Sequence, residues 1–215
     1  MTALVIIAKE CLPGKVKTRL HPPLTLEQAA RVASASLADT LGAVASLPAS
    51  RRILLFDGVN PPQGSEAYEI VPQVAGGLDR RLAAVFDLVD EPTMLIGMDT
   101  PQLTASMLRP VFEEWPVDVD AWFGPANDGG FWALALREPS GVLLRGVPMS
   151  QDDTGAHQLR RLAQYGLEVE FLPELVDVDT IDDARVVARL APDRLFARVL
   201  ASCSADSALA GAVAA

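Results

Sequence analysis

The chain opens with the apolar run LVIIA at residues 4–8, and the charged stretch KECLPGKVKTRL at residues 9–20 follows it directly. Five apolar residues that stop at charged ones are typical of a buried strand, and they are too few for a secretory signal. Further on, Thr25 begins a helical pattern with Gln28 three residues later, which is the spacing of a capping box. A strand, a loop and a helix in this order predict the first unit of an α/β fold.

Apolar runs of strand length continue to alternate with helical patterns along the chain. Further strands are expected at residues 53–56, 70–71, 93–97, 121–123, 131–136 and 168–172, and helices at residues 25–44, 78–89, 104–115, 155–164 and from Thr180 onward. Strands joined by helices require crossover connections, which predicts a mainly parallel central sheet with helices on both faces. Ligands bind beyond the carboxyl ends of the strands in such sheets, so the loops that follow strands are the places to look for chemistry.

Size and composition narrow the classes of function. The 215 residues, half of them hydrophobic, suit one domain, which we expect over residues 1–200, with the Ala- and Ser-rich residues 201–215 as a frayed tail. The formal net charge of −10 argues against a nucleic-acid partner. Two isolated cysteines, Cys11 and Cys203, give no disulfide framework and fit a cytoplasmic protein. No apolar run approaches the roughly 20 residues of a membrane span.

The loop at residues 9–20 is the first candidate for ligand binding. It carries the cations Lys9, Lys15, Lys17 and Arg19, an unusual density in an acidic chain. Its Pro-Gly pair predicts a tight turn, and Lys and Arg side chains are suited to holding a polyphosphate. A solvated basic loop without a ligand is the alternative. The spacing is not that of a P-loop, and no Gly-x-Gly-x-x-Gly follows the first strand, which argues against an ordinary dinucleotide-binding fold.

Two acidic stretches are candidates for binding a cation. Asp99 follows the strand expected at residues 93–97, while Asp177 and Asp179 are two positions apart, so both can face one ion from an extended segment. A hard divalent cation often takes one or two protein carboxylates and completes its shell from phosphate and water. The alternatives are that Asp99 caps the next helix or the turn, and that Asp179 caps the last helix.

A glycine-rich loop, GPANDGG at residues 124–130, lies between two expected strands. Such a loop brings the backbone close to a ligand and aims Asp128 outward, although a long turn without a ligand is an even alternative. The two histidines, His21 and His157, are far apart in sequence, and no Ser or Cys nucleophile can be paired with a base.

Taken in order, four segments resemble one family. They are KxxxPGxxKTRL at residues 9–20, GxDxPxL at residues 97–103, GPAxDGG at residues 124–130 and DxDT at residues 177–180. They are similar to the bacterial glycosyltransferase family DUF2064, within the GT-A nucleotide-diphospho-sugar transferase superfamily, and the resemblance runs over about residues 1–190. Related nucleotidylyltransferases, including the guanylyltransferases that activate phospholactate or phosphoenolpyruvate, share part of this pattern.

The resemblance implies a single-domain GT-A fold and a set of site residues. It implies Mg²⁺ or Mn²⁺ bound by Asp99, Asp177 and Asp179, with Asp128 and Lys17 as catalytic residues. The implied nucleotide-binding residues are Lys9, Gly14, Lys15, Lys17, Thr18, Arg19, Gly77, Gly97, Gly129 and Gly130. One residue departs from the pattern: Asp79 stands in place of the second glycine in the family's Gly-x-Leu-Gly-x-Arg-Leu segment. A side chain there would occupy a place where the backbone approaches the nucleotide.

The expected function is therefore metal-dependent transfer from a nucleotide-activated donor, most readily a nucleotide sugar, to a small-molecule acceptor. The alternative among enzymes is a nucleotidylyltransferase, guanylyltransferase-like, that activates a phosphorylated metabolite and releases pyrophosphate. The alternative of another class is a non-catalytic nucleotide-sensing domain. Asp79 favours that last possibility, and the retained carboxylates argue against it.

Overall fold

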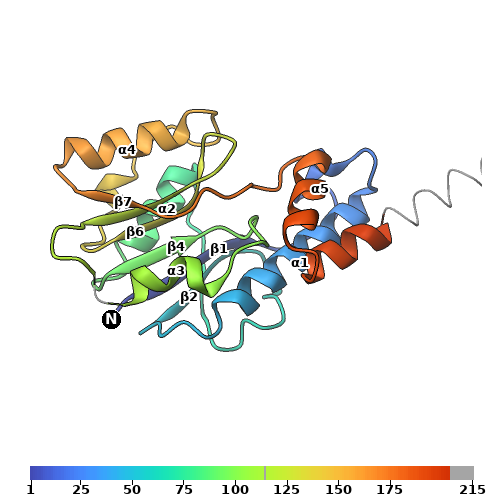
Figure 1. Cartoon of the computed structure of the whole chain (residues 1–215), viewed down its shortest axis with the longest axis horizontal. Coiled ribbons are helices and arrows are strands. Elements are labelled where there is room, and N and C mark those ends of the chain that lie inside the picture. Colours follow the sequence, from blue (N-terminus) through green and yellow to red (C-terminus); the bar gives the residue numbers. More distant parts are fainter. Residues whose placement is uncertain (114, 204–215) are drawn as a thin grey trace, which may run out of the picture.

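A computed structural model describes residues 1–113 and 115–203 of the chain. Within these residues, one sheet of seven strands has the order β3-β2-β1-β4-β6-β5-β7 (Figure 1). The strands are β1 (Ala3–Lys9), β2 (Arg52–Asp57), β3 (Glu69–Pro72), β4 (Thr93–Ile96), β5 (Ala121–Pro125), β6 (Phe131–Leu136) and β7 (Val169–Phe171). The helices are α1 (Leu26–Val44), α2 (Leu78–Phe86), α3 (Ala105–Phe112), α4 (Thr154–Gln164) and α5 (Ile181–Leu190), with short 3-10 helices η1 (Thr18–Leu20) and η2 (Gly141–Leu143).

The sheet is mainly parallel, as the strand–helix alternation predicts. β1 pairs in parallel with β2 and β4, β2 with β3, and β5 with β7. β6 is the exception, because it is antiparallel to both β4 and β5. The loop between β5 and β6 is too short for a crossover, so the second strand has to return in the opposite direction. The predicted mixed α/β architecture is confirmed.

Both faces of the sheet are covered by helices. Alternate residues of β1 point to opposite faces, so Leu4 and Ile6 pack with α1 and α3, while Ala3 and Val5 pack with α2 and α4. Two hydrophobic layers therefore sandwich the sheet, and the loops at its carboxyl edge stay at the surface.

A third hydrophobic cluster lies beyond the edge of the sheet, where the C-terminal part of the chain packs on the first half of α1 (Figure 1). Residues 195–203 are helical, and Phe196 and Cys203 are buried between this segment, α1 and α5. The tail expected from residue 201 thus begins inside this helical segment, and residues 204–215 lie outside the described residues. Among the described residues, no helix combines the length and the apolar character needed to cross a bilayer.

A threonine is the N-cap residue of three of the described helices, and its side chain forms a capping bond at two of them. Capping boxes are present at Thr25, with Gln28, and at Thr180, with Asp183. Thr104 is the N-cap of α3 but makes no capping bond, because its hydroxyl lies 2.8 Å from that of Ser106. The N-cap residue of α3 is thus Thr104 and not Asp99.

Candidate functional site

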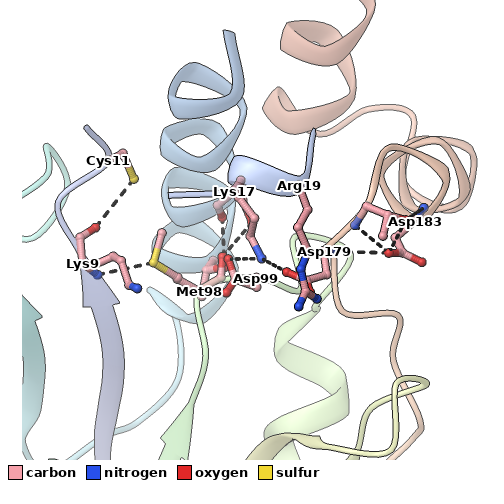
Figure 2. Close-up of polar contacts among 11 residues, drawn as sticks. Lys9, Cys11, Lys17, Arg19, Met98, Asp99, Asp179 and Asp183 are labelled. Atoms are coloured by element: carbon pink, nitrogen blue, oxygen red, sulfur yellow. Dashed lines mark hydrogen bonds and ion pairs between the residues drawn. The ribbon is translucent and has the colours of Figure 1, made fainter. Parts of the chain in front are cut away.

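The basic loop after β1 delivers one lysine into a cluster of carboxylates. The loop turns at Gly14, with φ +74°, and Lys17 adopts a left-handed backbone conformation with φ +45°, which is uncommon for a residue with a side chain. The Lys17 ammonium then lies 3.0 Å from Asp99 Oδ1 and 3.8 Å from Asp179 Oδ1 (Figure 2). Two distant parts of the sequence thus meet on one lysine.

Lys17 is held as a buried cation. Only 9% of its side chain is exposed, and burial by itself would lower the pKa of the ammonium. The carboxylates of Asp99, Asp177 and Asp179 outweigh that effect, so the pKa of Lys17 is raised and the ammonium stays charged.

Arg19 adds a second cation at the same place. Its guanidinium donates to Asp179 Oδ2 at 2.5 Å, while most of the side chain remains exposed (Figure 2). Asp179 is also the residue before the capping box of α5, where its N–H and that of Thr180 both point at the Asp183 carboxylate. Of the two roles predicted for this stretch, Asp183 takes part in the helix cap, and Asp179 pairs with the cations of the basic loop.

Asp177 lies in the same cluster and forms no ion pair with another described residue. Burial raises the pKa of the Asp177 carboxyl to about 7, and the charge of Asp99 adds to the effect. Lys17 opposes it, whereas Asp128 and Asp179 contribute further in the raising direction. The carboxylates of Asp99, Asp177 and Asp179 therefore outnumber the two cations, Lys17 and Arg19, that lie among them.

As a site for a divalent cation, the cluster offers fewer ligands than the sequence suggests. No three or more His, Cys, Asp or Glu side chains of residues 1–113 and 115–203 are arranged to enclose a metal ion. The reason is the lysine, since its ammonium takes the position between Asp99 and Asp179. The Asp99 and Asp177 carboxylates repel each other, as the raised pKa of Asp177 indicates, and a divalent cation held by both, with its other ligands from phosphate and water, would relieve that repulsion. Asp179 serves the lysine and Arg19 instead.

The remaining residues of the basic loop surround this cluster at the surface. Lys9 ends β1 and is exposed, Lys15 is exposed in the loop, and Thr18 begins η1. Gly97 follows β4, and its N–H donates to the Trp132 carbonyl on β6. All of them lie at the carboxyl edge of the sheet, where the sequence predicts the ligand.

The segment before α2 also reaches this edge, next to β1 and β2. Gly77 is the N-cap of α2. Arg81 in the first turn pairs with Asp57 at 3.2 Å and contacts the side chain of Gln73, which in turn donates to the Ala8 carbonyl at 2.9 Å. Sequence reasoning missed Gln73 and Asp57, since nothing in their local pattern marks them.

Asp79 turns toward the protein backbone. Its carboxylate accepts the N–H of Gly146 at 2.9 Å, in the loop that follows η2. The side chain thus joins α2 to a neighbouring loop, and the one residue that departs from the family pattern has a structural explanation.

The glycine-rich loop between β5 and β6 is shaped by packing on α4. Gly129 has φ +84°, and a Cβ atom there would lie 1.7 Å from the Asp152 carbonyl oxygen. Its own carbonyl accepts the N–H of Gly155 at 2.8 Å. Asp128 is exposed beside it, with Oδ1 accepting the N–H of Gly130 at 2.9 Å. The structure therefore gives Gly129 a packing role and leaves Asp128 exposed, close enough to Asp177 for its charge to raise the pKa of that carboxyl.

Residues 31–151, more than half of the chain, match the family DUF2064, described as "Uncharacterized protein conserved in bacteria". The chain belongs to this family. The DUF2064 match includes Asp99 and Asp128, whereas Lys17, Arg19 and the acidic pair at residues 177 and 179 lie outside it. No match is found among curated proteins.

Solved structures are similar to this chain over most of its length. A protein from Desulfovibrio desulfuricans G20, described as a "putative nucleotide-diphospho-sugar transferase", is 25% identical, with a TM-score of 0.79 over 97% of this chain and 96% of its own. The 2-C-methyl-D-erythritol 4-phosphate cytidylyltransferase of Thermus thermophilus is 16% identical, with a TM-score of 0.53 over 89% and 100% of the two chains. The CMP:2-keto-3-deoxy-manno-octonic acid synthetase bound to CTP is 11% identical, with a TM-score of 0.53 over 89% and 99%. The fold is thus that of nucleotide-diphospho-sugar transferases and nucleotidylyltransferases.

Proposed function

We propose that this DUF2064 protein is a metal-dependent transferase that takes a group from a nucleotide-activated donor, with a nucleotide sugar as the donor. The observation that carries the proposal is the meeting of Asp99, Asp177 and Asp179 around Lys17 at the carboxyl edge of the sheet. Support for a sugar donor comes from the relative described as a nucleotide-diphospho-sugar transferase, which aligns over nearly the full length of both chains.

The residues of the cluster divide the work between donor and acceptor. Lys17 and Arg19 hold the diphosphate of the donor, the lysine as a point charge and the arginine as a fork. Asp99 and Asp177 hold Mg²⁺ or Mn²⁺, which when bound neutralises charge on the diphosphate. Asp128 accepts the proton of the acceptor hydroxyl. The hydroxyl oxygen bonds to the sugar carbon as the bond from that carbon to the nucleoside diphosphate breaks, and the nucleoside diphosphate departs.

Nucleotidyl transfer is the second candidate, because the same fold occurs in a cytidylyltransferase and in a synthetase solved with CTP, and the same cluster could hold a triphosphate. In that reaction a phosphorylated metabolite attacks the α-phosphate and pyrophosphate leaves. A nucleotide-sensing domain without activity stays the alternative of another class, and Asp79, whose carboxylate accepts the Gly146 N–H, is the residue that favours it.

The test is a screen of nucleoside triphosphates and nucleotide sugars with Mg²⁺ or Mn²⁺, read first by thermal shift and then by the released product. A nucleoside diphosphate indicates glycosyl transfer, and pyrophosphate indicates nucleotidyl transfer. Stabilisation should grow with ligand concentration, as binding linkage requires.

Asp99→Asn provides the decisive variant for the metal. It should abolish metal-dependent binding and turnover and keep the fold, because the amide is a poor ligand of the same shape. Asp120→Asn is the matched control, since Asp120 lies at the opposite edge of the sheet, before β5, and accepts the Glu168 N–H. Normal turnover by Asp99→Asn would refute the assignment of the metal.

A further inference from the structure

The segment at residues 175–178 is bonded to two different loops at once. On one side, the Leu175 N–H donates to the Pro125 carbonyl, and the Leu175 carbonyl accepts the Asn127 N–H. On the other side, the Val178 N–H donates to the Asp99 carbonyl at 3.0 Å. The segment therefore lies between the loop after β4 and the loop after β5.

Two side chains complete this attachment, one from each loop. Gln102 Nε2 donates to the Val176 carbonyl at 2.7 Å, and Asn127 Oδ1 accepts the Asp177 N–H at 2.9 Å. Together they hold both ends of one peptide group, the one that joins Val176 to Asp177, while the bond from the Val178 N–H to the Asp99 carbonyl holds the peptide group on the other side of Asp177. Val178, whose side chain is buried in the third hydrophobic cluster, anchors the next position.

The buried side chain of Gln102 reduces the stability of the folded protein. It is 8% exposed, and its Oε1 is buried with no hydrogen-bond partner among the described residues. The amide nitrogen of Gln102 thus has the Val176 carbonyl as its acceptor, whereas the amide oxygen has no donor among the described residues. A buried acceptor without a donor destabilises a protein. An apolar side chain would fill the space without that penalty, so the Nε2 bond is the feature that explains a glutamine here.

We propose that Gln102 and Asn127 are positioning residues, which hold the Asp177 carboxylate next to that of Asp99 so that the two can share one divalent cation. This inference rests on the proposed function. Both residues act through the backbone of the segment and touch neither the cation nor the donor.

The chain contains a matched control for Gln102. Gln158 is also a buried glutamine, its Nε2 donates to a backbone carbonyl, that of Leu143, and its Oε1 likewise has no partner among the described residues. It lies in α4, outside the cluster. Gln102→Met and Gln158→Met therefore remove the same bond at two places.

Two measurements test the proposal, one without ligand and one with it. Amide hydrogen exchange reports the local opening of Asp177 and Val178, and electron paramagnetic resonance reports Mn²⁺ bound with inorganic pyrophosphate, a diphosphate that carries no base. We expect Gln102→Met to lower the protection of the Val178 amide by about tenfold and to weaken Mn²⁺–pyrophosphate binding roughly 10- to 100-fold. Gln158→Met should change neither beyond its general loss of stability.

Asn127→Ala extends the test with an exposed residue, whose loss leaves the core intact, and Asn60→Ala is its control, because Asn60 is an exposed asparagine that donates to Glu10. Unchanged Val178 protection and Mn²⁺ affinity in Gln102→Met and Asn127→Ala would overturn the inference, as would equal losses in the paired controls. If wild type binds no Mn²⁺–pyrophosphate while Val178 loses protection only in the two test variants, the positioning of the segment stands and the metal-dependent function fails.

Discussion

Asp177 has a carboxyl whose charged form is disfavoured in the folded protein. Its carboxyl has a pKa of about 7, against 3.8 for an ordinary Asp, because it is buried near Asp99. The folded protein thus keeps a proton that the unfolded chain releases, so stability falls as pH rises from about 4 to about 7. Above that window the folded protein holds a poorly compensated buried charge.

Asp177→Asn should therefore stabilise the metal-free protein at pH 8, by roughly 1–3 kcal/mol, or several degrees in Tm, and should make little difference at pH 4. Thermal melts of both proteins across this range, without divalent ions, check the prediction. The variant should also lose the stabilisation that Mn²⁺–pyrophosphate gives to wild type. If the Tm values of the two proteins change with pH in the same way, the pKa of the Asp177 carboxyl is not raised by folding.

At the scale of elements, the two capping boxes offer a comparison between stability and function. Thr25 caps α1 away from the cluster, whereas Thr180 caps α5 directly after Asp179. Each threonine replaced by alanine should cost about 1 kcal/mol, because one helix N–H loses its acceptor. Only Thr180→Ala should also weaken Mn²⁺–pyrophosphate binding, since it frees the Asp183 carboxylate that accepts the Asp179 N–H. Denaturant melts and binding titrations on both variants check this. Equal Mn²⁺–pyrophosphate affinity in the two variants would show that the cap of α5 does not influence the site.

How far the sequence predicts these elements depends on whether the signal is local. Strand runs such as residues 4–8 and the two capping boxes are local patterns, and the strands and helices form where they indicate. The attraction of Lys17 to both Asp99 and Asp179 is not local, because it depends on a left-handed residue and on contacts between segments far apart in sequence. The sequence alone therefore suggests three carboxylates around a metal, and does not reveal that a lysine occupies part of that space.

For the whole molecule, the third hydrophobic cluster links the C-terminal helical segment to the site. Phe196 and Val178 belong to this cluster, while Phe86 lies in the core on the α2 face of the sheet. Phe196→Leu and Phe86→Leu should each destabilise the protein by roughly 1–3 kcal/mol. We expect only Phe196→Leu to increase exchange of the Val178 amide below the melting range, because the support of that residue is local. Equal exchange in both variants would mean that the site is held by the sheet alone.

The bond from the Val178 N–H to the Asp99 carbonyl has a consequence for the order in which the molecule assembles. Between its two ends lie β5, β6, α4 and β7, so this contact has a large sequence separation and a high entropic cost of closure. A growing or refolding chain can complete β1, β2 and β4 long before the acidic pair arrives. We therefore expect the capacity to bind a ligand to develop late in folding, so that a ligand stabilises the assembled protein and does not guide its early steps.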